Sequence, residues 1–349
     1  MNIKEILNAS VEKKASDIHL IVGLTPFLRI DGDLVGIDDK PVTAKEMEQA
    51  VFSLISPEQK EKFITARELD FGYELDGLRF RVNLHYERGN VGLVARVISD
   101  EMPTLEDLNM PPIVYSLLGL DQGLILVTGP TGCGKSTTLA AMLNYINSNR
   151  SCNIITLEDP IEYLFKSDKS IVMQRQLGTD MLTFESSLKH VLRQDPDVIM
   201  VGEMRDLETI AATITLAETG HLVLATLHTY SAAQTIDRII DIFPPHQQNQ
   251  VRMQLSMTLA GVISQRLLPK VGGGRVAARE IMINTPAVSN IIRENKIAQL
   301  KTVIETNAKD GMISLDQDLK KLYKDKIITR EMAQAQMVNP ELLDKFKLI

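Results

Sequence analysis

One segment of this 349-residue sequence has the spacing of a phosphate-binding loop. Residues 129–136 read GPTGCGKS and match G-x-x-x-x-G-K-[ST], with an apolar run before them and a helical pattern after them. Small residues let backbone N–H groups turn inward around phosphate oxygens, and the following helix adds its dipole. Lys135 supplies positive charge to the outer phosphates, and the Ser136 hydroxyl is a ligand for Mg²⁺. The sequence therefore predicts a site for ATP and Mg²⁺. Its loop residues are Gly129, Pro130, Thr131, Gly132, Cys133, Gly134, Lys135, Ser136 and Thr137.

Acidic residues and histidines adjoin three apolar runs further along the chain. Asp159 and Glu162 follow the run NIITL and Glu158, Glu203 follows DVIMVG, and His221 and His228 bracket LVLATL. Ligands collect at the carboxyl ends of strands in open α/β sheets, and ATP hydrolysis needs a carboxylate that orients the attacking water. Glu162 and Glu203 are our candidates. An acid here can instead cap a helix, an alternative open above all for Asp159, and a lone histidine is more often a hydrogen-bonded core residue.

The hydrophobic pattern divides the chain into two domains. Residues 1–99 are predicted to form a small α+β domain, and 100–112, which contain three prolines, an interdomain linker. In the first domain we expect helices at 2–14 and 44–63, the second opened by a capping box of Thr43 and Glu46, and strands within 17–37 and at about 69–75, 78–87 and 91–98. Asp76-Gly77 is a strong hairpin turn between two of these strands.

Residues 113–349 show a different rhythm. Apolar runs of four to six residues alternate with helical stretches, which is typical of strands covered on both faces in a parallel α/β sheet. The runs are 124–127, 153–157, 198–201 and 222–225. From about residue 289 onward the pattern predicts helices only.

Composition limits the classes of protein that this chain can represent. Lys and Arg number 38 and Asp and Glu 45, giving a formal net charge of −7, so a general nucleic-acid binder with a basic patch is disfavoured. The two cysteines, Cys133 and Cys152, cannot form a four-thiolate zinc site or a disulfide framework, and they fit a reducing cytoplasm. The first ten residues contain no apolar stretch of a signal peptide, so we expect no leader.

Several segments together resemble the type II/IV secretion ATPase superfamily, and within it the type IV pilus retraction ATPases. They are ASDIHL (15–20), FRVN (80–83), the Walker A loop at 129–136, ITLEDPIEY (155–163, resembling the aspartate box), DPDVIMVGEMRDLET (195–209, resembling the Walker B region) and TGHLVLATLHT (219–229, resembling the histidine box). These motifs occur in the family's order and span nearly the whole chain.

The resemblance implies a PAS-like N-terminal domain, a RecA-like ATPase domain with a helical tail, and a ring of six subunits with ATP between the two domains. By this resemblance, Glu162 would be the catalytic glutamate, Glu203 would bind Mg²⁺ through water, and His228 would sense the phosphate. Arg81 and Arg96 match arginines that reach the phosphates in the family. Glu158, Asp159 and His221 lie in the matching boxes and count as cofactor-binding. An inner-membrane pilus platform protein is the implied partner, with the motor on the cytoplasmic face of the bacterial inner membrane and no direct contact with nucleic acid.

Two features bear on whether the motor assembles or retracts pili: the absence of a zinc insert and a short C-terminal motif. Assembly members carry a four-cysteine zinc insert after a QRL segment, whereas here SQRLLPK (264–270) runs directly into GGGR. This difference favours retraction. Retraction members also carry AIRNLIRE, and residues 287–294 read AVSNIIRE, with Val288 and Ser289 in place of Ile and Arg. The alternatives are an accessory retraction motor, an assembly or secretion motor, a nucleotide-gated regulator that hydrolyses little, and a RecA-type nucleic-acid motor.

Overall fold

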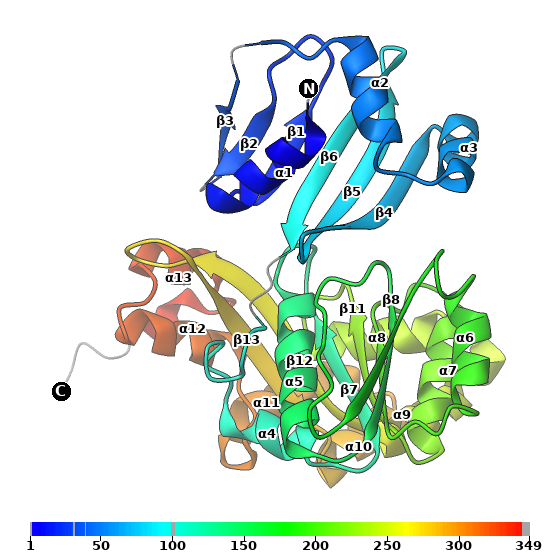
Figure 1. Cartoon of the computed structure of the whole chain (residues 1–349). Helices are drawn as coiled ribbons and strands as arrows, with labels where there is room; N and C mark the ends of the chain where they lie inside the picture. The colour runs from blue at the N-terminus through cyan, green and yellow to red at the C-terminus, as the bar shows by residue number, and fades with distance from the viewer. Residues whose placement is uncertain (1, 31, 39, 99–101, 344–349) are drawn as a thin grey trace. The chain divides into compact units, whose positions relative to one another are not determined.

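The chain divides into two compact units, drawn in Figure 1. The computed structural model describes residues 2–30, 32–38, 40–98 and 102–343. The first unit comprises Met1–Glu101 and Pro160–Leu164, and the second comprises Met102–Asp159 and Phe165–Ile349. The predicted division at 1–99, 100–112 and 113–349 stays a prediction, and residues 100 and 101 of the expected linker lie outside the described residues. Leu105 and Met110 are buried in the core of the second unit.

The first unit is an antiparallel sheet with helices on one face. Its described elements are α1 (Ile3–Glu12), β1 (Asp17–Leu20), β2 (Phe27–Ile30), β3 (Asp33–Gly36), α2 (Ala44–Phe52), α3 (Pro57–Ala66), β4 (Glu68–Leu75), β5 (Leu78–Glu87) and β6 (Asn90–Ile98). The strand order is β3-β2-β1-β6-β5-β4. On β5, Phe80, Val82 and Leu84 are buried in the core that includes the helices. Because side chains alternate along a strand, Arg81 and Asn83 lie on the opposite, polar face.

Most elements predicted for this unit are confirmed, but the single helix at 44–63 is wrong. The Thr43–Glu46 capping box opens α2, and Asp76 and Gly77 form the β4–β5 turn with φ of 52° and 83°. The helix stops after Phe52, and α3 starts afresh from a second capping box of Ser56 and Gln59. Pro57 is the physical reason: it has no N–H to continue the preceding helix, yet it suits the first position of a new one.

The second unit is built on a mostly parallel sheet. Its strands have the order β13-β12-β7-β11-β10-β8-β9, and only β12 and β13 pair antiparallel. The described elements are α4 (Pro112–Leu118), β7 (Gly123–Thr128), α5 (Lys135–Asn149), β8 (Asn153–Glu158), β9 (Ile171–Gln176), α6 (Phe184–Val191), β10 (Val198–Val201), α7 (Leu207–Glu218), β11 (Leu222–Leu227), α8 (Ala232–Asp241), α9 (Pro245–Thr258), β12 (Leu259–Pro269), β13 (Arg275–Ile283), α10 (Pro286–Arg293), η1 (Ile297–Gln299), α11 (Leu300–Thr306), η2 (Ala308–Asp310), α12 (Leu315–Lys324), α13 (Arg330–Gln336) and η3 (Pro340–Leu343).

The four predicted apolar runs are strands β7, β8, β10 and β11, as expected. Strands β9, β12 and β13 were not predicted, because polar residues interrupt their apolar patterns. The expectation of helices alone after residue 289 holds except at Ile313, which forms an isolated bridge to Ile281 on β13. No helix within the described ranges is long and apolar enough to cross a membrane.

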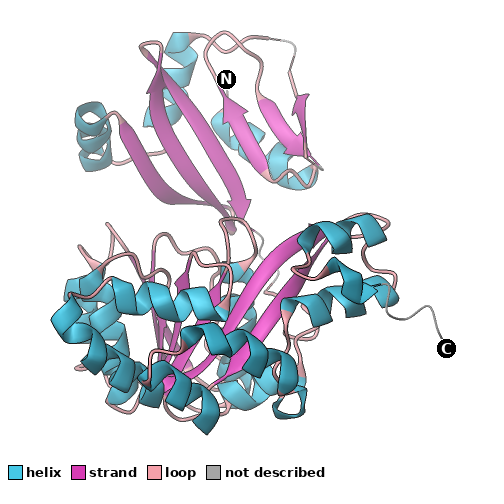
Figure 2. Cartoon of the chain, turned by 180° about the vertical axis from the view of Figure 1, so that it is seen from behind, coloured by secondary structure: helices cyan, strands magenta, loops and turns pink. Residues whose placement is uncertain are grey.

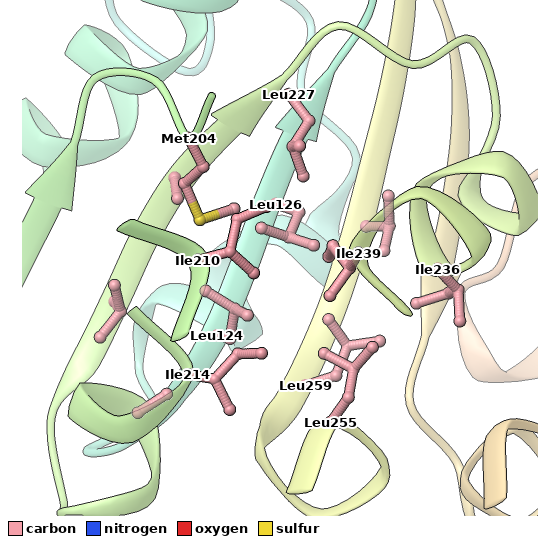
Figure 3. Packing of buried hydrophobic residues seen from close by; sticks show 14 of the residues in the cluster. Leu124, Leu126, Met204, Ile210, Ile214, Leu227, Ile236, Ile239, Leu255 and Leu259 are labelled. Carbon is pink, nitrogen blue, oxygen red and sulfur yellow. The ribbon is translucent and has the colours of Figure 1, made fainter. Parts of the chain in front are cut away.

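Both faces of the central sheet are buried, and this fixes the strand ends in space. Leu124 and Leu126 of β7 share a core with α7, α8 and α9, and Figure 3 shows Ile210 and Ile214 of α7 beside them. The alternate residues of β7 point to the other face and share a core with α5. Figures 1 and 2 show these helices on opposite sides of the sheet. The carboxyl ends of β7, β11 and β10 therefore lie next to one another along one edge.

The core of the first unit depends on large side chains such as Phe80, which is fully buried. We expect Phe80→Ala to lower the free energy of unfolding of this unit by about 3–5 kcal/mol, because the lost ring leaves a cavity. Urea denaturation followed by far-UV circular dichroism measures the change. Leu34→Ala on β3, where the side chain is 51% exposed, is the control and should cost less than about 0.5 kcal/mol. Equal costs for the two variants would contradict the assigned core.

Candidate functional site

The predicted phosphate loop joins the carboxyl end of β7 to the start of α5. Gly129, Gly132 and Gly134 adopt φ of 147°, 76° and 88°, a region that side chains disfavour. Gly129 is the most restricted, because an added Cβ would lie 2.3 Å from the backbone oxygen of Gln265 and 2.5 Å from Cys133 Sγ. Only glycine fits there, so the turn at the start of the loop requires glycine at position 129.

The loop presents positive charge and helix N–H groups. Lys135 Nζ donates to the backbone oxygens of Gly129 at 2.8 Å and Pro130 at 3.1 Å, so the ammonium lies against the first half of the loop. Gly134 is the N-cap of α5 and has no side chain to accept from the first helical turn. A helix start of this kind suits an anion. Cys133 is buried, and burial raises the pKa of its thiol, which agrees with a packing role.

A chain of polar contacts links the loop to the ends of β10 and β11. His228, just after β11, has Nδ1 3.5 Å from Thr131 Oγ1 and Nε2 3.1 Å from Glu203 Oε1. Arg205 Nη2 donates to Glu203 Oε2 at 2.7 Å. The sheet thus brings together three residues that are far apart in sequence: Thr131, Glu203 and His228. Glu203 and His228 thus meet at adjacent strand ends, and their part in the chemistry stays a prediction.

The charge state of Glu203 follows from this network. Burial by itself would raise the pKa of Glu203, but the hydrogen bond and charge of Arg205, with the charges of His228 and Lys135, outweigh it and lower the pKa below its ordinary value. In turn, the hydrogen bond to Glu203 raises the pKa of Arg205, and Asp159 adds to this effect. Glu203 is therefore an anion at neutral pH, and Asp159 lies near enough to act on the same cation.

The other predicted residues of the aspartate box occupy two different environments. Glu158 ends β8 and is buried, where its Oε1 accepts from Thr156 Oγ1 at 2.7 Å and Gln174 Nε2 at 3.0 Å. The bond to Gln174 links β8 to its neighbour β9. Glu162 lies in Pro160–Leu164, the segment grouped with the first unit, whereas Asp159 belongs to the second.

Arg81 and Arg96 are direct cross-strand neighbours on β5 and β6 of the first unit. Asp17 on β1 is the next residue in this row, and Arg96 Nε donates to its Oδ1 at 2.8 Å. Cross-strand partners share one face of a sheet, so the two arginines lie together on the polar face. This pairing follows from the two-residue turn at Arg88 and Gly89, which sets the register of the β5–β6 hairpin.

His221 is at the opposite end of β11 from His228. Its Nδ1 lies 2.9 Å from the backbone oxygen of Leu216 and 3.2 Å from Thr219 Oγ1, at the end of α7. A strand of this length separates its two ends by about 20 Å. Within the second unit, His221 is therefore not brought to the phosphate loop, and its assignment to the cofactor stays a prediction.

Two residues of the site were not predicted from the sequence. Arg205 donates a hydrogen bond to Glu203, and Gln265 on β12 is bonded to Cys133 of the phosphate loop and to Thr138 of α5. The available signal was weak in both cases. Arg205 is an isolated cation just after a strand end, and Gln265 is one of three polar residues, SQR, inside an otherwise apolar run.

A family model described as "Type II/IV secretion system protein" matches residues 1–332. The chain belongs to this family. It is 47% identical over 342 residues to the type IV pilus retraction ATPase PilT of Pseudomonas aeruginosa, covering 98% of this chain and 99% of that protein. It is 44% identical over 342 residues to a twitching motility protein of Neisseria gonorrhoeae, covering 97% and 91%.

A solved structure titled as the pilus retraction motor PilT and bound ADP is similar throughout. It has a TM-score of 0.92 and 46% identity, and the match covers 99% of this chain and 100% of that one. The expected α/β fold of the type II/IV secretion ATPases is thereby confirmed. Membership of this ATPase family also supports nucleotide use by the loop at 129–136.

The Glu203 network predicts a measurable pH effect. A carboxylate with a lowered pKa stays charged until the pH falls through that value, so the stabilisation it provides is lost only in acid. We expect Arg205→Gln to raise the pKa of Glu203, because the hydrogen bond and charge that outweigh burial are gone. Carbon-13 NMR titration of the glutamate carboxyl groups measures it, with Glu203→Gln identifying the signal.

Lys189→Gln is the control, because Lys189 pairs with Glu185 and has no contact with Glu203. It should leave the Glu203 titration unchanged. An unaltered midpoint in Arg205→Gln would show that Arg205 does not lower the pKa of Glu203.

Proposed function

We propose that this chain is a subunit of an ATP-hydrolysing motor that retracts type IV pili and so powers twitching motility. The main observation that supports ATP hydrolysis is that Thr131 and His228 link the phosphate loop, which bears Lys135, to the anionic Glu203. The names of the relatives, a pilus retraction ATPase and a twitching motility protein, support the type of work.

The residues around the loop suit a nucleotide-bound Mg²⁺. Mg²⁺ prefers oxygen ligands and takes only one or two from protein when phosphates and water supply the rest. The described residues contain no group of three or more His, Cys, Asp or Glu side chains for an all-protein metal site. We assign the Ser136 hydroxyl as a direct ligand and the Glu203 carboxylate as a ligand through water. The ion would neutralise phosphate charge during hydrolysis.

Each remaining site residue has a proposed role in turnover. Glu162 orients and deprotonates the attacking water, and His228 responds to the outer phosphate through its contact with Thr131. Arg81 and Arg96, adjacent on one sheet face, bind phosphate charge. Release of the phosphate removes the charge that these arginines bind, so the conformation favoured by ATP loses its advantage. This loss couples chemistry to movement.

Retraction is the proposed direction, supported by the β12–β13 connection. These strands are joined by a short turn in which Gly272, Gly273 and Gly274 all have positive φ. The chain has no cysteine in this region, so it lacks the zinc insert expected of assembly motors. We further propose a homohexamer with a PAS-like domain and a RecA-like domain in each subunit. It would bind a pilus platform protein at the cytoplasmic face of the inner membrane.

An accessory motor is the second candidate, because residues 287–294 depart from the C-terminal motif AIRNLIRE at Val288 and Ser289. Val288 is fully buried, and the Ser289 hydroxyl lies 2.8 Å from the backbone oxygen of Ser256 and 3.0 Å from Asn284 Oδ1. Both substituted positions of AVSNIIRE therefore pack into the second unit. Arg293 and Glu294 are exposed and remain as the polar part of the motif that a partner can contact.

Glu162→Gln tests the catalytic assignment. The change removes the carboxylate base and keeps the shape, so we expect nucleotide affinity near that of the wild type and ATP turnover lower by at least about 100-fold. Fluorescent ADP titration and phosphate release measure the two quantities. Glu185→Gln on α6 is the matched control and should turn over ATP normally. Wild-type turnover in Glu162→Gln would exclude Glu162, and negligible turnover by the wild-type chain would favour a nucleotide-gated regulator.

Lys135→Ala tests the direction of the motor in cells. Loss of the ammonium removes phosphate binding charge, so a retraction motor without it should leave more surface pili and no twitching. Electron microscopy and a twitching assay measure both, in cells whose only copy carries the change. Fewer pili would identify an assembly motor. An unchanged count would identify an accessory motor whose work another ATPase performs.

A further inference from the structure

Gln265 is the only side chain in the described part of β12 that is hydrogen-bonded to both the phosphate loop and the first turn of α5. It is 2% exposed. Its Nε2 donates to the backbone oxygen of Cys133 at 2.8 Å, and its Oε1 accepts from Thr138 Oγ1 at 3.0 Å. Both hydrogen-bonding functions of one buried amide are thus satisfied by the loop and helix.

These two partners flank the residues that do the binding chemistry. Cys133 comes two residues before Lys135, and Thr138 comes two residues after Ser136. A single amide therefore holds the chain on both sides of the ammonium and the hydroxyl. The backbone of Gln265 adds a steric constraint, because its oxygen fills the place of a side chain at Gly129.

The bond to Cys133 also sets the direction of a backbone donor. In a planar trans peptide, the C=O and the N–H point in opposite directions. Since the Cys133 oxygen points at Gln265, the N–H of Gly134 points away from β12. Backbone N–H groups of such a loop bind an anion only when they converge, so each peptide must be held in one orientation.

We propose that Gln265 is a positioning residue of the phosphate site, which holds the Cys133–Gly134 peptide in its phosphate-binding orientation. The proposal rests on the proposed nucleotide function. Gln265 acts through the loop and not by contact with the reacting atoms. Loss of binding that is equal in the ground state and the transition state raises KM and leaves kcat unchanged. Since Gln265 does not contact the reacting atoms, we expect its loss to act in this way.

Gln265→Met is the main test, because it keeps the length of the side chain and removes both hydrogen bonds. We expect the Kd for ADP and the KM for ATP to rise about tenfold, which corresponds to about 1.4 kcal/mol, with kcat within about threefold of wild type. Tripolyphosphate, used as a competitive inhibitor, should lose affinity by the same factor, because the loop contacts phosphates and not the base.

Ser264→Ala is the matched control. Ser264 precedes Gln265 on β12, is equally buried, and is bonded to Thr128 Oγ1 at 2.8 Å, below the loop. It should lower the melting temperature without changing ADP or tripolyphosphate affinity. A merely structural role of Gln265 would give the same result in Gln265→Met, and that outcome would overturn the proposal.

Thr138→Val is a second variant in case Gln265→Met does not fold. It removes the donor to Gln265 Oε1 and should raise the Kd for ADP about threefold. The double variant should be no weaker than Gln265→Met alone, since the two residues share one bond; additive losses would contradict the shared role. A wild-type chain that neither binds nor hydrolyses ATP would instead refute the proposed function. Normal wild-type activity with unchanged affinity in both variants would refute the role of Gln265 alone.

Discussion

Close packing of β12 against the start of the phosphate loop is the constraint on which the site depends. The backbone oxygen of Gln265 takes up the space where any side chain at position 129 would lie, and the loop can turn there only because glycine tolerates a φ of 147°. The buried sheet holds β12 at this distance, since β7 is paired with β12 on one side and β11 on the other. The core thus controls the phosphate site through backbone geometry.

The same sheet provides the electrostatic part of the site. Strand β11 places His228 next to Thr131 of the loop and Glu203 at the end of β10, and the hydrogen bond and charge of Arg205 help to lower the pKa of Glu203 despite its partial burial. This carboxylate is the group that we propose binds Mg²⁺ through water. In the first unit, the polar face carries Arg81 and Arg96 side by side, and the opposite face of that sheet buries the core. In the second unit the charged residues lie at the edge of a buried sheet. In the first unit they lie on the sheet face opposite the core.

Much of the fold could be predicted from the residues, and the failures have identifiable causes. The four strands that are buried on both faces appear as continuous apolar runs, and the Asp76-Gly77 turn has a specific chemistry. Hydrophobic periodicity alone predicts one helix over 44–63, but Pro57 begins a second helix within it. Strand β12 was not predicted because Ser264, Gln265 and Arg266 interrupt its apolar pattern. Each of these polar side chains is bonded to another element: Ser264 to Thr128, Gln265 to the loop, and Arg266 to Gln336 of α13.

The linear order of residues was enough to determine the phosphate loop, the carboxylates at the strand ends and membership of a secretion ATPase family, because these depend on local spacing. It could not show that Arg205 is bonded to Glu203, or that His228 lies between Thr131 of the loop and Glu203. Those relations depend on strand order and register. They arise only when the buried faces of each sheet bring residues that are distant in sequence into contact.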